Sequence, residues 1–184
     1  MTIYNWIIIA LWIVFWVYWA ISSLSAKKVV HRDTSGVWMR YIGIIFVIVL
    51  IIFLPASFNI KFGAHTSAVM AVGTILCASG ISLAIWARRY LGKNWSALPS
   101  IQEHHELVTA GPYRFLRHPI YTGVITALFG SALATNVGWF IIFLFFASTF
   151  VWRIDREEQF MMQFFPDEYP EYKKHTKKLI PFVW

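Results

Sequence analysis

The chain has 184 residues, of which 58% are hydrophobic and only 14% charged, and its mean hydropathy is +0.58. Soluble globular domains carry about a quarter charged residues, so this composition excludes an ordinary soluble protein and indicates a chain that lies in the bilayer. The net charge of +7 does not indicate a nucleic-acid-binding protein, and we expect no nucleic acid partner, because the pattern offers no soluble basic domain to hold one.

Apolar runs long enough to cross a membrane follow one another along the chain. A span needs about 20 apolar residues to cross a ~30 Å hydrocarbon core. By that measure we expect transmembrane helices at 3–24, 37–58, 67–87, 119–134 and 138–152. Only Thr135, Asn136 and Val137 separate the last two, which is typical of a tight helical hairpin. The sequence therefore predicts an all-α integral membrane protein with five transmembrane helices, in one domain over residues 1–184.

The first apolar run could be mistaken for a secretory signal. It lacks a basic start, and Trp and Tyr fill the region where a cleavage site would lie, so we expect a retained anchor helix. Trp12, Trp16 and Trp19 recur on it at helical spacing, which indicates packing or lipid contact. The single cysteine, Cys77, lies within an apolar run and is expected to pack as a small hydrophobic residue.

The basic residues predict how the helices are oriented. Cytoplasmic loops retain Lys and Arg, and 15 of the 16 basic residues fall in the segments that follow the first, third and fifth spans. Lys61 alone follows the second span. This division predicts an N-terminus outside and a C-terminus in the cytoplasm, in the inner membrane if the source is bacterial.

The fourth helix is short and begins beside charged residues. Its 16 residues reach about 24 Å at ~1.5 Å per residue, less than a typical hydrocarbon core. Either the bilayer thins locally, or the helix starts below the interface and places Arg117 and His118 in a protein-lined cavity. Pro119 suits the first helical position, and the free N–H groups beside Arg117 would then form an anion site. The alternative is that Arg117 and His118 simply mark the interface.

Small residues form stripes on the third and fourth helices, which indicates close packing of helix backbones, with a cofactor wall as the alternative. The stripes comprise Gly73, Cys77, Gly80, Ala84 and Ala87 on one helix and Gly123, Ala127, Gly130, Ser131 and Ala134 on the other.

Two adjacent carboxylates, Glu157 and Glu158, follow the fifth helix, with Arg153 one turn before Glu157. A solvated surface with a weak i,i+4 ion pair is the ordinary explanation of such a pattern. If the pair faces Arg117 and His118 instead, it could receive a cationic or hydroxyl-rich ligand. The segment His104–Glu106 lacks the spacing of a zinc site, so we expect no metal.

Taken together, these polar segments resemble a known family. The string HELVTAGPYRFLRHPIYTG, an apolar hairpin, the residues Arg153, Glu157 and Glu158, and the string FFPDEYPEYKKHTKKLIPF are similar to the isoprenylcysteine carboxyl methyltransferase family. The family pattern is R-H-P-x-Y, a hydrophobic stretch and E-E. The resemblance covers roughly residues 91–184, and the first two helices carry no recognisable motif.

The resemblance implies a membrane methyltransferase that uses S-adenosylmethionine without a Rossmann domain. The implied division is N-terminal helices over 1–66 and a cofactor-binding core over 67–184. In the family, the segment before helix four and the C-terminal segment form a cytoplasmic cofactor pocket. Arg153 matches the family's arginine ahead of the acidic pair, which implies a catalytic role or a role in substrate orientation. The implied cofactor-binding residues are His105, Leu107, Val108, Gly111, Tyr113, Arg117, His118, Tyr121, Glu157 and Glu158.

The chemistry of S-adenosylmethionine suits these residue types. Its carboxylate would lie near Arg117, and Glu157 and Glu158 would meet the ribose hydroxyls or the ammonium. Leu107, Val108 and Tyr113 would enclose the adenine. The expected acceptor is a lipophilic small molecule, a lipidated substrate or a membrane lipid.

Three other functions remain open. A phospholipid N-methyltransferase would also carry an acidic pair near its C-terminus. A sterol-reductase-like enzyme would use NADPH, whose 2′-phosphate Glu157 and Glu158 would repel. A non-catalytic membrane scaffold would need no intact pocket. His105 and His118 are the only obvious bases. This favours an anionic acceptor that needs no deprotonation, or else an acceptor whose proton is lost to solvent.

Overall fold

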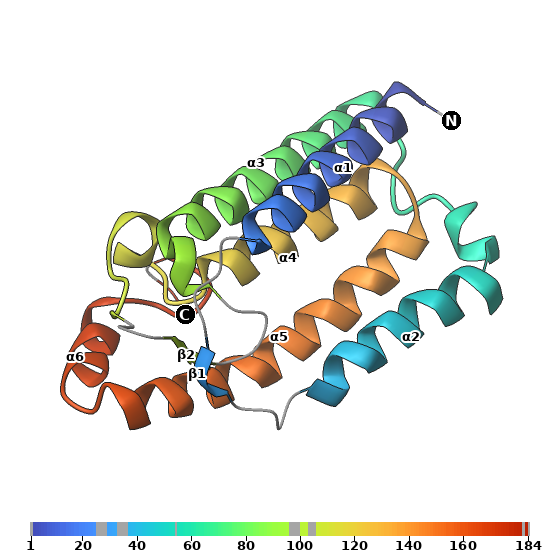
Figure 1. The fold of residues 1–184 in the computed structure, drawn as a ribbon. Helices are drawn as coiled ribbons and strands as arrows, with labels where there is room; N and C mark the ends of the chain where they lie inside the picture. Colours follow the sequence, from blue (N-terminus) through green and yellow to red (C-terminus); the bar gives the residue numbers. More distant parts are fainter. Residues whose placement is uncertain are drawn as a thin grey trace.

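The computed structural model describes residues 2–24, 29–32, 37–53, 55–95, 100–102, 106–181 and 183. Within these residues the fold is built from helices and is completed by one short ribbon of two strands (Figure 1). The helices are α1 (Ile3–Ser23), α2 (Val37–Phe53), α3 (Ser67–Leu91), α4 (Pro119–Ala134), α5 (Val137–Phe164) and α6 (Glu168–His175), and the 3₁₀ turns are η1 (Pro55–Phe58), η2 (Gly92–Asn94) and η3 (Gly111–Arg114).

All five predicted apolar runs form helices, although several ends differ. The second helix stops at Phe53, and the 3₁₀ turn η1 follows because Pro55 cannot continue the α-helical hydrogen-bond ladder. The fifth helix continues to Phe164, so Arg153, Glu157 and Glu158 lie within it rather than beyond it. Among the described residues, three helices are long and apolar enough to cross a membrane, namely α1, α3 with its extension to Asn94, and α5. The apolar parts of α2 and α4 are shorter.

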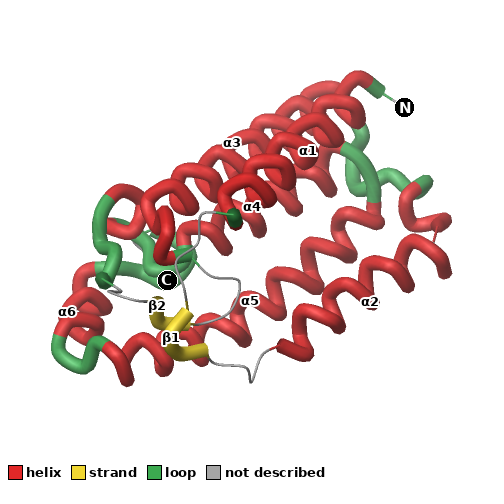
Figure 2. The backbone as a smooth tube through the Cα atoms, in the orientation of Figure 1, coloured by secondary structure: helices red, strands yellow, loops and turns green. Residues whose placement is uncertain are grey.

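A ribbon of two strands interrupts the otherwise helical fold. β1 (Val29–Arg32) pairs antiparallel with β2 (Ser100–Gln102), with Val29 opposite Gln102 and Arg32 opposite Ser100 (Figure 2). The prediction of an all-α fold did not include this ribbon. Val29, Val30 and Ile101 favour strands, but segments this short show no periodicity, and each needs a partner that is remote in sequence.

The helices α3 and α4 lie in direct backbone contact. A Cβ atom added to Gly80 would lie 2.5 Å from the Ala127 nitrogen, and one added to Gly123 would lie 2.5 Å from the Gly80 oxygen. Only glycine permits such an approach. The stripes of small residues are therefore a packing surface between these helices, as the first of the two interpretations predicts. Cys77, fully buried there, packs as a small apolar residue.

The remaining helices form two groups around this pair. α1 packs on α3 and α4, whereas α2 lies along α5, which runs back from the hairpin at Thr135 and Asn136 (Figure 1). The Asn136 side chain accepts a hydrogen bond from the Trp139 amide at 3.3 Å and so caps α5. The two groups share one apolar core, to which α1, α2, α3, α4 and α5 all contribute.

The C-terminal segment returns to the start of α4. The Arg117 and His118 amides donate hydrogen bonds to the carbonyls of Lys177 at 2.8 Å and Lys178 at 3.1 Å. The Thr122 hydroxyl donates to the Leu179 carbonyl at 2.7 Å. These bonds fix the segment after α6 against the chain that leads into α4, so both segments that carry the polar motifs lie together.

Candidate active site

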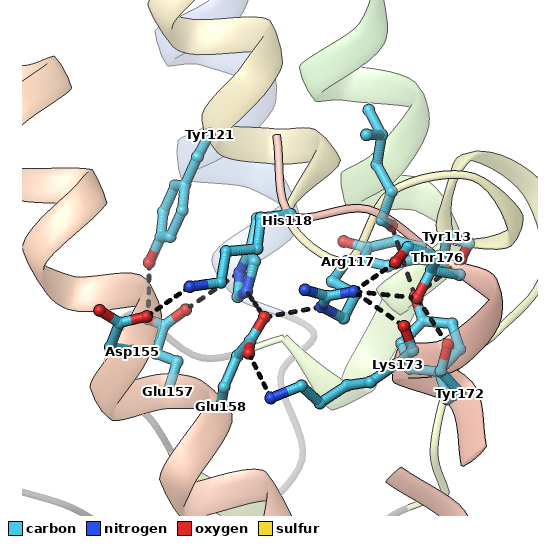
Figure 3. A network of polar contacts seen from close by, with 12 residues as sticks. Tyr113, Arg117, His118, Tyr121, Asp155, Glu157, Glu158, Tyr172, Lys173 and Thr176 are labelled. Carbon is cyan, nitrogen blue, oxygen red and sulfur yellow. Dashed lines mark hydrogen bonds and ion pairs between the residues drawn. The ribbon is translucent and has the colours of Figure 1, made fainter. Parts of the chain in front are cut away.

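Arg117, His118, Arg153, Glu157, Glu158 and Lys173 form a charged cluster. At its centre is a buried ion pair between Arg117 and Glu158. Arg117 Nε lies 2.6 Å from Glu158 Oε1, and the two side chains are only 7% and 3% exposed. Lys173 Nζ approaches the other oxygen of Glu158 at 2.9 Å. Arg117 Nη1 also donates to the Thr176 carbonyl and, at 3.4 Å, to the Lys173 carbonyl. The pair thus joins the segment that leads into α4 to α5 and to the end of α6 (Figure 3).

Glu157 gathers a second set of partners. Tyr121 Oη and Arg153 Nε each donate to Glu157 Oε1 at 2.6 Å. His118 Nδ1 lies 3.6 Å from Glu157 Oε2. Figure 3 shows the ring of His118 between the two carboxylates, with Tyr121 pointing toward Glu157. The two adjacent carboxylates of α5 therefore have different partners. Glu158 binds Arg117 and Lys173 and so links α5 to the segment before α4 and to α6, whereas Glu157 binds the side chains of Tyr121 and Arg153.

Two polar atoms near this cluster are buried without a hydrogen bond from the part of the chain that the structure describes. One is Nε2 of His118, which lies 3.5 Å from Glu158 Oε1, and the other is Oδ1 of Asn94. The His118 side chain is 9% exposed, and its ring stacks on Tyr121 with the two planes 4° apart. Buried polar groups normally have partners, so both atoms are suited to a ligand.

Two tyrosines connect the C-terminal helix to the turn before α4. Tyr172 Oη donates a hydrogen bond to the Tyr113 carbonyl at 2.7 Å. Burial raises the pKa of Tyr172 and that of Tyr113 above the ordinary value, because a phenolate would lose its hydration there. Both groups therefore stay protonated at neutral pH, and Tyr172 remains a donor.

A cavity of about 910 Å³ extends from this cluster between the helices. One end is polar and charged, and the rest is lined by aromatic and aliphatic side chains. The polar end includes Asn94, Tyr113, Arg117, His118, Tyr121, Arg153, Glu157 and Tyr172, and the apolar part includes Trp12, Phe15, Trp16, Trp19, Val124, Leu128, Trp139, Ile142, Phe146 and Phe150.

Most of the predicted site residues lie on this cavity. Those that line it are Leu107, Val108, Tyr113, Arg117, His118, Tyr121, Arg153 and Glu157. Glu158 is not among the lining residues and lies behind Arg117. Gly111 has φ +61°, and a Cβ there would meet the Tyr90 ring at 2.6 Å, so the turn and the close packing both require glycine. His105 lies outside the described residues.

The anion site expected at the start of α4 differs in detail from its prediction. The amides of Arg117 and His118 bond to carbonyls of the C-terminal segment, and the Arg117 guanidinium bonds to Glu158 and Thr176. The Arg117 guanidinium, one of the donors that sequence reasoning assigned to a ligand carboxylate, is therefore already bonded to Glu158 and to the C-terminal segment.

Sequence reasoning missed the aromatic wall and a buried arginine. The spacing of Trp12, Trp16 and Trp19 was visible, but it did not reveal that these rings line a cavity. Arg88 was counted only as a topological charge, yet it is 1% exposed and donates to the carbonyls of Ser22 at 2.7 Å and Gly92 at 2.6 Å. It thereby fixes the end of α1 beside the polar end of the cavity.

Comparison with known proteins identifies the class and then the family. The apolar helices and the relatives described below make this chain a multi-pass integral membrane protein. The family model described as phospholipid methyltransferase matches residues 68–168, which is more than half of the chain. The chain therefore belongs to the phospholipid methyltransferase family.

Individual relatives agree with the resemblance seen in the sequence. Protein-S-isoprenylcysteine O-methyltransferase B of Arabidopsis thaliana is 36% identical over 103 residues, which cover 50% of this chain and 49% of that protein. The cobalt-zinc-cadmium resistance protein CzcN of Cupriavidus metallidurans is 29% identical over 165 residues, or 86% of this chain and 68% of that protein. The chain spans about half the length of the two Arabidopsis thaliana isoprenylcysteine methyltransferases that it matches.

A solved structure shares the fold. The eukaryotic intramembrane Ras methyltransferase, an isoprenylcysteine carboxyl methyltransferase, matches with a TM-score of 0.57 and 24% identity, over 82% of this chain and 54% of that one. The predicted resemblance to the isoprenylcysteine carboxyl methyltransferases is confirmed by these matches.

Proposed function

We propose that this protein transfers a methyl group from S-adenosylmethionine to a carboxylate on a lipophilic acceptor, such as an isoprenylcysteine-like molecule. The observation that carries the proposal is one cavity with two chemically different ends. Charged and hydrogen-bonding side chains from α4, α5, α6 and the segments before α4 line one end, and aromatic residues of α1 and α5 line the other. A water-soluble methyl donor and a lipid-soluble acceptor need such a continuous site.

The residues at the polar end fit S-adenosylmethionine. Nε2 of His118 and Oδ1 of Asn94 are buried and without a hydrogen bond from the described chain. Glu157 presents a carboxylate to the cavity, which suits hydroxyl and ammonium groups and tolerates a sulfonium. Leu107, Val108 and Tyr113 line the same end and would enclose the adenine. Glu158 would act through Arg117, and Gly111 through the turn that places Tyr113.

When bound, S-adenosylmethionine supplies an electrophilic methyl carbon that forms a bond to an acceptor oxygen while the electron pair of the broken C–S bond stays on sulfur. An ionised carboxylate acceptor needs no general base. The task of the protein is therefore alignment. Arg153 would orient the acceptor carboxylate, because its side chain lines the cavity and is held by Glu157 at 2.6 Å. The aromatic walls exclude water from the reacting groups.

We further propose that all five apolar helices, α1 to α5, cross the membrane, with the N-terminus outside. Of the 16 basic residues, 15 lie beyond the apolar runs of α1, α3 and α5, either in the connecting segments or in adjacent helix ends, as Arg40, Arg88 and Arg153 do, and such segments remain in the cytoplasm. The polar end of the cavity would then open toward the cytoplasm, where S-adenosylmethionine is available. One membrane domain over residues 1–184 would contain both binding regions.

The test is methyl transfer by the purified protein in lipid vesicles. Labelled S-adenosylmethionine would be supplied with N-acetyl-S-farnesylcysteine, and we expect a labelled product whose methyl group is released by alkali, as from an ester. Phosphatidylethanolamine serves as the second acceptor, since the family model is described as phospholipid methyltransferase. A methylated amine on this lipid would keep its label in alkali. Label found only on the amine of phosphatidylethanolamine would contradict methyl transfer to a carboxylate.

Cofactor binding separates the other functions. Binding of NADPH in place of S-adenosylmethionine would indicate a reductase, and binding of neither would indicate a scaffold.

A further inference from the structure

Two stacked indoles lie in the apolar part of the cavity, far from the charged cluster. Trp12 of α1 and Trp139 of α5 have ring centroids 5.5 Å apart and planes within 15° of parallel. Both rings line the cavity. Trp139 belongs to the first turn of α5, next to the hairpin at which α4 and α5 meet. The pair therefore bridges α1 and α5 where the two groups of helices converge.

The Trp12 ring is held in a fixed orientation. Its Nε1 donates a hydrogen bond to Ser131 Oγ at 3.0 Å, and that hydroxyl donates to the Ala127 carbonyl at 2.8 Å. Ser131 is fully buried and Trp12 is 9% exposed, so rotation of the indole would leave a buried N–H without a partner. Phe15 meets the same ring edge-on with centroids 5.4 Å apart. The pair is a rigid surface.

The helix rises of α5 and α4 each give the distance from the charged cluster to the Trp12–Trp139 pair. Fourteen residues of α5 separate Trp139 from Arg153, which is about 21 Å at ~1.5 Å per residue. Thirteen residues separate His118 from Ser131 on α4, which gives about 20 Å. A single chain in one leaflet occupies about 15 Å, half of the ~30 Å core. The cavity is thus long enough for one fully extended lipid chain.

We infer that the Trp12–Trp139 pair is the floor of the acceptor site and limits the length of the acceptor's apolar chain. The occupant is a single-chain amphiphile with an anionic head. Arg153 and His118 receive the head, and aromatic side chains of α1 and α5 surround the chain. The identity of the head rests on the proposed function, whereas the length limit rests on the floor alone.

The first test measures binding without any methyl donor. The probes are N-acetyl-S-alkylcysteines whose unbranched chains grow in even steps, and affinity is measured by calorimetry in detergent. Each buried methylene adds about a fourfold gain in affinity, so affinity should rise with length and level off where the chain reaches the floor. In Trp139→Ala and Trp12→Ala the affinity should level off only at longer chains. Probes two methylenes past the wild-type limit should bind these variants about 16-fold tighter than they bind the wild type.

The matched control is Trp6→Ala. Trp6 lies on the same helix as Trp12, is 59% exposed and is not among the residues that line the cavity, so its removal should leave the length limit in place. An unchanged limit in both Trp12→Ala and Trp139→Ala would overturn the inference, as would a wild type whose affinity shows no limit.

A second measurement keeps the inference testable if either variant fails to fold. A probe of limiting length with a diazirine on its last carbon is photolysed in the wild-type protein, and cross-linked residues are identified by mass spectrometry. Labelling at Trp12 or Trp139 is expected, and labelling that avoids both would overturn the inference. Methyl transfer is assayed separately. A length limit that shifts in the variants, without methyl transfer to any of these acids, would contradict the proposed function and support the inference about Trp12 and Trp139. Methyl transfer with a length limit that is the same in all variants would support the proposed function and contradict the inference.

Discussion

Nε of Arg117 lies 2.6 Å from Oε1 of Glu158, although 41 residues separate the two in sequence. Both side chains are almost completely buried. A buried charge that loses its partner is strongly destabilising, because the remaining ion keeps its desolvation cost. This pair therefore holds the start of α4 against α5 and the C-terminal segment, and the geometry of the cavity depends on it.

We expect Arg117→Ala and Glu158→Ala each to destabilise the protein by about 3–5 kcal/mol. The double variant should be less destabilised than the sum of the two, because the single variants each strand one charge. Thermal unfolding in detergent checks both expectations. The control is Lys174→Ala, which breaks an exposed pair with Glu171 and should leave the melting temperature unchanged. Additive effects of Arg117 and Glu158 would show that the two do not stabilise each other.

Arg153 should affect turnover more than cofactor affinity. We expect Arg153→Ala to lower methyl transfer at least about 100-fold, because misaligned reactants lose most of their effective concentration. Arg153→Lys should recover little, since lysine lacks the planar fork of donors. The measurements are kcat with the isoprenylcysteine analogue and calorimetry with S-adenosylmethionine. Arg156→Ala is the neighbouring control, an exposed arginine stacked 4.2 Å from the Trp152 ring. Normal turnover in Arg153→Ala would remove Arg153 from the mechanism.

Tyr121→Phe isolates one hydrogen bond at the polar end. The change deletes the hydroxyl that donates to Glu157 at 2.6 Å and retains the stack on Phe150, whose centroid lies 4.4 Å away. A hydrogen bond to a charged group contributes about 1.5–3 kcal/mol, so affinity for S-adenosylmethionine should fall roughly tenfold or more. Tyr90→Phe, at an exposed tyrosine of α3 outside the cavity, should not change it. Equal affinities in all three proteins would exclude Tyr121 from cofactor binding.

The contact between α3 and α4 predicts a strong effect of one methyl group. Gly80→Ala would place a Cβ 2.5 Å from the Ala127 nitrogen, so the helices must separate. We expect a loss of about 1–3 kcal/mol in stability, the usual cost of overpacking. Gly43→Ala is the matched control on α2, where the new Cβ would lie 3.8 Å from the Phe145 ring. Similar melting temperatures for Gly80→Ala and wild type would mean that the two backbones lie farther apart than described.

The proposed orientation can be tested by cysteine labelling. Lys61→Cys and Lys177→Cys should react with an impermeant thiol reagent from opposite faces of the membrane. The native Cys77 is fully buried and should contribute no background. Reaction of both positions from the same face would contradict an odd number of crossings between them and the charge-based orientation.

The sequence by itself determined the helices and the residue types of the site. Composition and the length of each apolar run are local properties, and they suffice because every backbone group in a bilayer must bond within its own segment. The motif residues Arg117, His118 and Glu157 were likewise visible, and the structure brings them together at one end of the cavity. The stripes of small residues around Gly80 and Gly123 also indicated that these helices pack closely against other helix backbones.

Only the tertiary structure decided how these parts meet. The pairing of β1 with β2, the Arg117–Glu158 ion pair and the role of Arg88 all join residues that are remote in sequence. The same holds for Trp12 and Trp139, since a tryptophan at helical spacing looks alike whether it faces lipid, a core or a cavity. Helix formation follows from hydrogen bonds over four residues, whereas a cavity follows from the relative placement of several whole helices, which the pattern along any one helix does not specify.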